Sequence, residues 1–179
     1  MGDAAWPSWP ARVAARERGD ARAALPPPPA PRNGVLVLDA AAHPCASCLP
    51  GGLLAGVAGP LHYLDLGGVS AASLAEFGLP AAALAGVVKA YCCGSGLTSL
   101  DGVGPPAALR YLYLDGNALP EAALLALAAA PWARTLEALD VRGNPGCTPA
   151  ACAALRAALA PGAFLNGARG EALRLPEAG

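Results

Sequence analysis

Two stretches near the middle of the chain, 109–117 and 136–144, share one spacing of apolar residues. Both fit the pattern L-x-x-L-x-L-x-x-N, with valine at the third apolar position of the second stretch, and they start 27 residues apart. Apolar residues two positions apart predict a short strand with one buried side. A pattern that recurs at such a period indicates repeated units, each of which must stack on its neighbours to bury its apolar side. This repetition constrains the fold more than any other feature.

The same register extends upstream. Units start at Leu61, Val87, Leu109 and Leu136, at spacings of 26, 22 and 27 residues. The upstream units are weaker, because Val69 and Ser95 stand where the later units have asparagine. An independent check supports the register, since glycine precedes the ninth position in every unit: Gly68, Gly94, Gly116 and Gly143. A chain that turns out of a strand bends most easily at glycine.

The asparagine at the ninth position has a mechanical role in such a repeat. Its amide is expected to be buried in the turn, where it can pair with backbone groups of neighbouring units. Ser95 can do this only weakly and Val69 not at all. We therefore expect the first half of the array to be held less tightly than the second.

The remaining segments divide the chain into three parts. Residues 1–34 form an N-terminal extension with a Trp-Pro motif (Trp6, Trp9), a short helix and the polyproline spacer 26–29. Residues 35–167 form the repeat domain, and 168–179 a tail. Within the domain we expect a first strand at 35–38, as an atypical capping unit. Helices are expected at 73–77, 121–130 and 150–159.

The end of the domain carries the most specific resemblance. Asn144-Pro145, the helix with Leu155-Arg156, and the closing Leu159 to Gly167 segment resemble the C-terminal cap of the SDS22-like class of leucine-rich repeat proteins. The resemblance implies an α/β solenoid: a horseshoe with a parallel β-sheet on its concave side and short helices or irregular coils on its convex side. The cap would cover the open edge of the sheet with Leu155, Leu159, Phe164 and Leu165.

Side chains between the inward leucines should point to the concave face, because successive residues of a strand alternate. All four tyrosines of the chain fall there. Tyrosine is enriched in interface cores, although it is also common in sheets generally. We therefore predict a protein-binding face that comprises Tyr63, Asp65, Lys89, Tyr91, Tyr111, Tyr113, Asp115, Asp140 and Arg142.

Two other groups of residues have alternative interpretations. Trp6 and Trp9 either pack on the first repeat or anchor a partner, since tryptophan is enriched at binding hot spots. Cys45 and Cys48, with His43 nearby, form half of a zinc-binding pattern, but the second half is missing. Structural cysteines are the expectation, and metal binding at Cys45 and Cys48 stays open.

Composition and motifs limit the functional classes. The net charge of −1 disfavours a dedicated nucleic-acid binder. The sequence shows no secretory signal and no apolar run long enough for a membrane span, so a cytoplasmic protein is expected. Phosphate-binding glycine loops, G-x-S-x-G and His-Glu metal motifs are absent. We expect no enzyme, no cofactor, no metal and no small-molecule substrate.

The resemblance then implies the function. The expected role is a non-catalytic protein–protein interaction scaffold, a structural subunit of a larger intracellular assembly, with a ciliary, axonemal or cytoskeletal setting. The alternative is a regulatory subunit that binds and modulates an enzyme such as a protein phosphatase.

Overall fold

A computed structural model describes residues 33–38, 40, 54, 57, 59–103, 107–167 and 172–174, the last three by their backbone alone. The expectations for Trp6 and Trp9, and for Cys45 and Cys48, concern residues outside these ranges.

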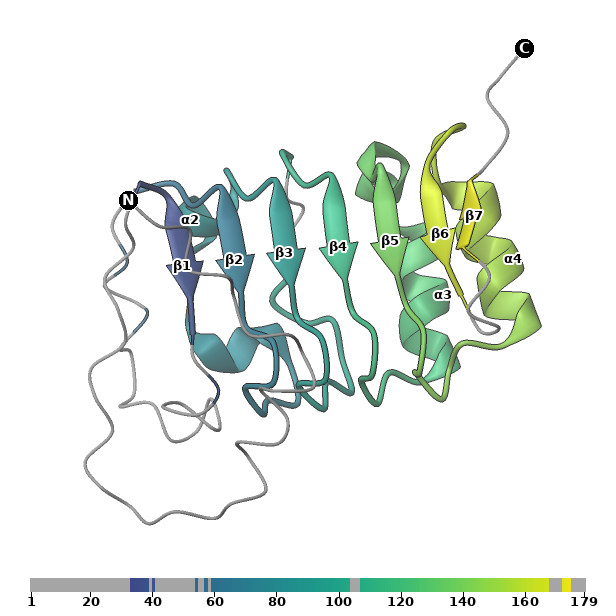
Figure 1. Ribbon diagram of the computed structural model, residues 1–179, viewed down its shortest axis with the longest axis horizontal. Coiled ribbons are helices and arrows are strands. Elements are labelled where there is room, and N and C mark those ends of the chain that lie inside the picture. The colour runs from purple at the N-terminus through teal and green to yellow at the C-terminus, as the bar shows by residue number, and fades with distance from the viewer. Residues whose placement is uncertain are drawn as a thin grey trace, which may run out of the picture.

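One sheet organises the described chain. Its strands are β1 (Val35–Val37), β2 (Tyr63–Asp65), β3 (Lys89–Tyr91), β4 (Tyr111–Tyr113), β5 (Ala138–Asp140), β6 (Phe164–Asn166) and β7 (Ala172–Arg174), and they follow one another in sequence order (Figure 1). Strands β1 to β6 are parallel, and β7 pairs antiparallel with β6. The architecture is therefore α/β, built on a single, mainly parallel sheet.

The strand register agrees with the spacings expected from the repeat. Tyr63 pairs with Lys89, Lys89 with Tyr111, and Tyr111 with Ala138. These steps of 26, 22 and 27 residues bring each unit to the same position beside its neighbour. The expected first strand also forms, as β1.

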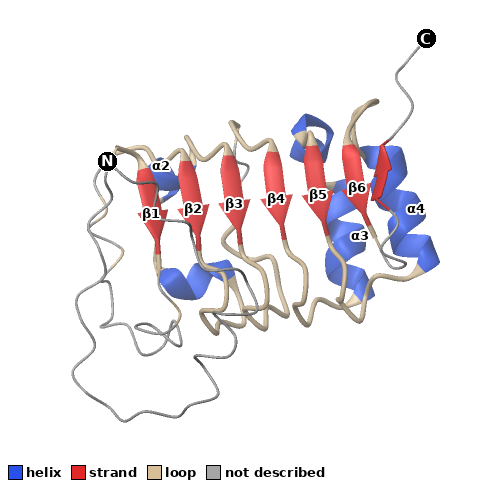
Figure 2. Ribbon diagram, viewed as in Figure 1, coloured by secondary structure: helices blue, strands red, loops and turns tan. Residues whose placement is uncertain are grey.

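The helices lie in the segments that connect the strands (Figure 2). They are the 3₁₀ helix η2 (Leu74–Phe77), α2 (Ala81–Leu84), α3 (Glu121–Ala129), the 3₁₀ helix η3 (Pro131–Thr135) and α4 (Pro149–Ala158). Helices α3 and α4 pack together behind the sheet in Figure 1. The three expected helices are confirmed to within a residue or so, the first as a 3₁₀ turn, whereas the single-turn helix α2 was not expected.

The core lies between the sheet and these connecting segments. The central residue of each parallel strand points into it, and all six are buried: Leu36, Leu64, Ala90, Leu112, Leu139 and Leu165. The next inward row is buried too: Leu38, Leu66, Cys92, Leu114 and Val141. Trp132 is partly buried and packs against this core. Burial of this continuous apolar stack is what holds units of three-residue strands together.

The turns after the strands show why glycine and asparagine recur. All four glycines before the ninth position have positive φ, between 58° and 77°, a region that costs other residues a steric penalty. Asn117 donates from Nδ2 to the carbonyls of Cys92 (2.7 Å) and Leu114 (2.8 Å). Its Oδ1 accepts from the N–H groups of Ser95 (2.9 Å) and Leu97 (3.1 Å). The buried amide thus joins two neighbouring units, as expected.

Asn144 repeats the pattern, donating to the Leu114 and Val141 carbonyls and accepting from the N–H of Leu119. In the two earlier units the residue at the ninth position makes fewer such bonds. Ser95 donates a single hydroxyl bond of 2.9 Å to the Leu66 carbonyl, with a longer contact to Cys93. Val69 is buried but has no side-chain polar group with which to make such a bond.

The C-terminal cap differs from the expectation in two respects. Leu155, Leu159 and Leu165 are buried as expected, but Phe164 is 40% exposed and lies on the opposite face of the sheet. Strand alternation explains this, because Leu165 points inward and its neighbour must point outward. In addition, β7 forms within the segment 168–179, which is expected to be a tail. Its pairing with β6 supplies hydrogen bonds that the edge strand would otherwise lack.

The helices of the described ranges are all short. None of them has both the length and the apolar character needed to cross a bilayer.

Candidate protein-binding surface

The strand residues that alternate with the inward leucines project from the other side of the sheet. In-register pairing arranges them in two rows that run across the strands. The first row contains Val35, Tyr63, Lys89, Tyr111, Ala138 and Phe164. The second contains Val37, Asp65, Tyr91, Tyr113, Asp140 and Asn166. We call the five half-exposed side chains at the centre the tyrosine face: Tyr63, Lys89, Tyr91, Tyr111 and Tyr113.

The tyrosine rings contact one another. Tyr91 and Tyr113 are stacked, with ring centroids 4.4 Å apart and planes 5° from parallel. They occupy the same row on adjacent strands, and the centroid distance is close to the strand spacing of about 4.8 Å. Tyr63 lies one row away, so its ring is tilted by 44° to that of Tyr91 at 5.6 Å. The pairing of the strands thus builds a continuous aromatic surface.

Lys89 places its ammonium group among these rings. Its Nζ atom lies 4.9 Å from the ring centroid of Tyr91, 5.5 Å from that of Tyr113 and 5.8 Å from that of Tyr111. Distances below about 6 Å allow cation–π attraction. Hydrogen bonding with the Tyr91 side chain is the main reason that the pKa of Lys89 is raised above its ordinary value. The ammonium is therefore charged at neutral pH.

Tyr111 is held from the next strand. Its hydroxyl donates a hydrogen bond of 2.5 Å to Oε2 of Glu137, and Arg110 Nε lies 3.8 Å from Oε1 of the same carboxylate. The hydrogen bond to Glu137 and the negative charge of that group raise the pKa of Tyr111. Glu137 and Arg110 thus position the ring, although the sequence pattern did not mark them as site residues.

Asp140 and Arg142 form a closed pair beside the rings. The Arg142 guanidinium donates from Nε to Oδ1 at 3.0 Å and from Nη2 to Oδ2 at 2.7 Å. Asn166 donates to Oδ2 at 3.1 Å. Asp140 is only 6% exposed, and its carboxylate raises the pKa of Arg142. Asp140 therefore orients Arg142, whose side chain is the exposed member of the pair.

The other expected aspartates differ in depth. Asp65 is 5% exposed, and its Oδ1 accepts from the N–H of Gly67 at 2.9 Å. Asp115 is half-buried on the turn after β4. The structure thus brings all nine predicted residues to one face but leaves Asp65 and Asp140 almost without accessible surface.

Two apolar residues at the ends of the first row were missed as site residues. Val35 is 41% exposed on β1 and Phe164 is 40% exposed on β6. In the structure Phe164 lies exposed between buried Ala163 and Leu165, whereas the sequence pattern marked it only as part of the cap. Phe164 extends the apolar part of the face beyond the tyrosines.

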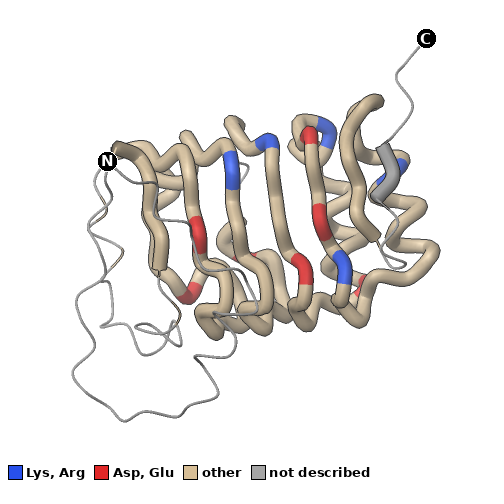
Figure 3. Tube along the Cα trace, in the orientation of Figure 1, with Lys and Arg blue, Asp and Glu red and all other residues tan. Residues whose placement is uncertain are grey.

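Charged groups on the sheet do not form a patch of one sign. Figure 3 shows basic and acidic positions interleaved along the strands. Ring faces together with one central ammonium suit noncovalent recognition of a partner that carries apolar groups.

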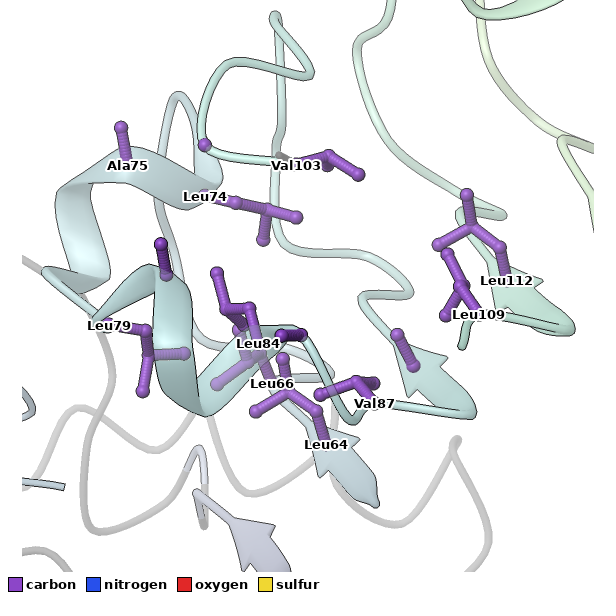
Figure 4. Close-up of a pocket in the computed structure, with 14 residues that line it drawn as sticks. Leu64, Leu66, Leu74, Ala75, Leu79, Leu84, Val87, Val103, Leu109 and Leu112 are labelled. Atoms are coloured by element: carbon purple, nitrogen blue, oxygen red, sulfur yellow. The ribbon is translucent and has the colours of Figure 1, made fainter. Parts of the chain in front are cut away.

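A cavity of about 650 Å³ lies on the other side of the sheet (Figure 4). Its lining includes Ala90 together with leucines such as Leu64, Leu84 and Leu112, and the described residues contribute no polar side chain to it. The inward row has alanine at β3 where the other parallel strands have leucine, which leaves space at this point. Ala90 is thus one border of the cavity, and the described lining offers no acidic, basic or nucleophilic side chain.

The described cysteines are free thiols. Burial raises the pKa of Cys92 to about 12, and burial with a neighbouring thiol raises that of Cys147 to about 12. Sγ of Cys147 lies 3.3 Å from Sγ of Cys152 inside the cap. Within the described ranges no three histidine, cysteine or acidic residues gather as metal ligands would. Cys45 and Cys48, which are expected to be structural, lie outside these ranges.

No model of a known protein family matches the chain, and no curated protein and no solved structure matches it. The class that the fold defines is an α/β domain with one mainly parallel sheet.

Proposed function

We propose that the chain is a leucine-rich repeat protein whose tyrosine face binds another protein. The repeat assignment is supported by the recurring leucine and asparagine pattern and by the in-register, sequence-ordered strands. Its role is that of a non-catalytic scaffold, a structural subunit of a multi-subunit cytoplasmic assembly. From the resemblance described above we take a ciliary or cytoskeletal setting.

One observation carries the proposal: the contiguous ring surface formed by Tyr63, Tyr91 and Tyr113. Stacked rings restrain one another. Binding of a partner therefore orders few further side chains of the face, and the entropy cost of binding is smaller. Tyrosine also combines apolar area with a hydroxyl that can pair at the edge of an interface. The face is therefore organised before a partner arrives.

The charged residues of the predicted site then divide by role. Asp65 and Asp140 are supporting residues, because each is buried and its carboxylate accepts hydrogen bonds from its own turn. Lys89, Asp115 and Arg142 are the groups that a partner can reach. Partner contact at Lys89 and Arg142 would determine specificity.

The test is affinity purification of the protein and two variants from the cells that produce it, followed by mass spectrometry. The double variant Tyr91→Ala, Tyr113→Ala removes the stacked pair, and Leu125→Ala removes a 41% exposed side chain on α3 as the control. We expect the double variant to lose the co-purifying partner and the control to retain it. Retention of the partner by a double variant with unchanged circular dichroism would show that this surface is the wrong one.

A second purification tests the N-terminal extension. If Trp6 and Trp9 anchor the partner, deletion of residues 1–32 lowers partner recovery while the repeat domain stays folded. Full recovery after the deletion would leave the tyrosine face as the binding surface and remove the extension from it.

A further inference from the structure

The first row of the open face has an unusual charge pattern. From β1 to β6 it reads valine, tyrosine, lysine, tyrosine, alanine and phenylalanine. Lys89 is the one charged member of this row, and it is also the only lysine in the whole chain. A single cation thus stands at the centre of an apolar and aromatic strip.

That cation has no carboxylate partner in the described part of the chain. The ion pairs there join Arg110 to Glu137 and Arg142 to Asp140, and Lys89 takes part in neither. Glu137 also accepts from the Tyr111 hydroxyl, so its carboxylate is already engaged. The contacts of the Lys89 ammonium are instead ring faces and the Tyr91 side chain.

We infer that the partner presents a carboxylate to Lys89, from an aspartate or glutamate that is flanked on both sides by apolar side chains. The inference rests on the proposed function and names the partner's chemistry. When apolar groups of the partner cover the rings, water is excluded around Lys89. A carboxylate opposite the ammonium then makes a stronger charge-assisted hydrogen bond than it would in open solvent.

The strand geometry sets the spacing of these groups. Adjacent strands lie about 4.8 Å apart, so Val35 and Ala138 are each roughly 10 Å from Lys89 across the sheet, and Phe164 is roughly 14 Å away. The strip from Val35 to Phe164 therefore spans roughly 24 Å, or five strand steps. A partner segment of this length, with its acidic residue between apolar groups, matches the row.

The same geometry disfavours a cationic partner. An aromatic surface can receive an external ammonium group, but here three of the rings already lie beside the Lys89 ammonium. A second cation would meet repulsion from Lys89. The row-two carboxylates Asp65 and Asp140 are buried. Glu137 is engaged by Tyr111 and Arg110, and half-buried Asp115 lies beyond the second row, where its charge acts on Arg142. Charge complementarity thus selects an acidic partner.

The test is selection of peptides from a random display library on the folded full-length chain. The baits are the wild-type protein, Lys89→Met, Lys89→Glu and the control Arg156→Glu, which makes the same charge change on the exposed side of α4, away from the face. We expect wild type and Arg156→Glu to select acidic residues within apolar sequences. Lys89→Met should lose this preference, and Lys89→Glu should select lysine or arginine instead.

A synthetic peptide from the wild-type selection completes the test. Replacing its acidic residue by the corresponding amide should weaken binding to wild type about tenfold, as loss of one charge-assisted contact does, and leave binding to Lys89→Met unchanged. Peptides without an acidic preference, or an acidic preference that survives Lys89→Glu, would overturn the inference. Peptides that bind the Tyr91→Ala, Tyr113→Ala variant as tightly as wild type would overturn the proposed function itself.

Discussion

The ring of Tyr91 lies flat against that of Tyr113, with centroids 4.4 Å apart and planes 5° from parallel. The two residues are 22 positions apart in sequence, which is the spacing of their two repeat units. The repeat that builds the sheet therefore also builds the aromatic surface. Any change that shifts β3 against β4 should disturb both.

Removal of either stacked ring should lower stability modestly, and the two losses should not add. An aromatic pair contributes about 0.5–1.5 kcal/mol beyond the area that it buries. We expect a coupling free energy in that range from urea denaturation of Tyr91→Ala, Tyr113→Ala and the double variant. Strictly additive losses would mean that the rings do not interact in solution.

Asn117 should be the most sensitive polar position of the core. Alanine there leaves the Cys92 carbonyl and the N–H groups of Ser95 and Leu97 without this partner, whereas the Leu114 carbonyl keeps its bond from Asn144. Each buried unsatisfied group costs about 1–3 kcal/mol. We expect Asn117→Ala to lower the free energy of unfolding by about 3 kcal/mol or more. Ser95→Ala, which removes mainly one bond to the Leu66 carbonyl, should cost about 1 kcal/mol. Equal losses would contradict the interpretation of the turn.

Gly116 tests the turn conformation separately from its hydrogen bonds. Its φ is 68°, and an added Cβ would meet only ordinary contacts of 3.7 Å with Gly94. The penalty for Gly116→Ala should therefore be conformational, about 1–2 kcal/mol. Gly116→Asn should cost less, because asparagine tolerates this region. Thermal denaturation of both variants measures the difference, and an alanine variant as stable as wild type would contradict it.

Much of this fold follows from the sequence because its signals are local. The leucines of units three and four, the four glycines and the helices α3 and α4 lie where alternation, turn geometry and helix composition place them. Alternation also assigns the tyrosines to one face. The three-residue strands β6 and β7 carry no comparable signal, since their pairing depends on contacts between distant segments.

The depth of the site residues is not a local property. The pattern predicts that Asp65 and Asp140 lie on the same face as Lys89, but it does not predict that they are buried. Asp140 is covered because Arg142 folds over it from the same turn and Asn166 pairs with it from β6. Such burial depends on the neighbouring strand, which a single unit of sequence does not specify.

Ala90 gives a test of the core. Ala90 is an alanine in a row of leucines and borders the cavity, so Ala90→Leu should be tolerated and should raise the midpoint of thermal unfolding. The reverse change on the next strand, Leu112→Ala, should cost about 2–5 kcal/mol by creating a cavity. Marked destabilisation by Ala90→Leu would show that the space is already filled.

Thiol reactivity tests the burial of Cys92. With a pKa raised to about 12 by burial, its thiol is almost entirely protonated at pH 8, and the thiolate is the reactive form. We expect iodoacetamide to label Cys92 much more slowly in the folded protein than in denaturant, and the folded rate to rise with pH towards 12. Peptide mass spectrometry measures the site. Equal labelling in the two states would contradict this burial.

The account's central claim is that the tyrosine face contacts a protein partner, and site-specific photo-crosslinking tests it most directly. A p-benzoylphenylalanine residue replaces Tyr111 in one variant and Leu125, exposed on α3, in another. After irradiation in the cells that produce the protein, we predict a covalent adduct with the co-purifying partner from position 111 and none from position 125. An adduct from position 125 alone would contradict the account.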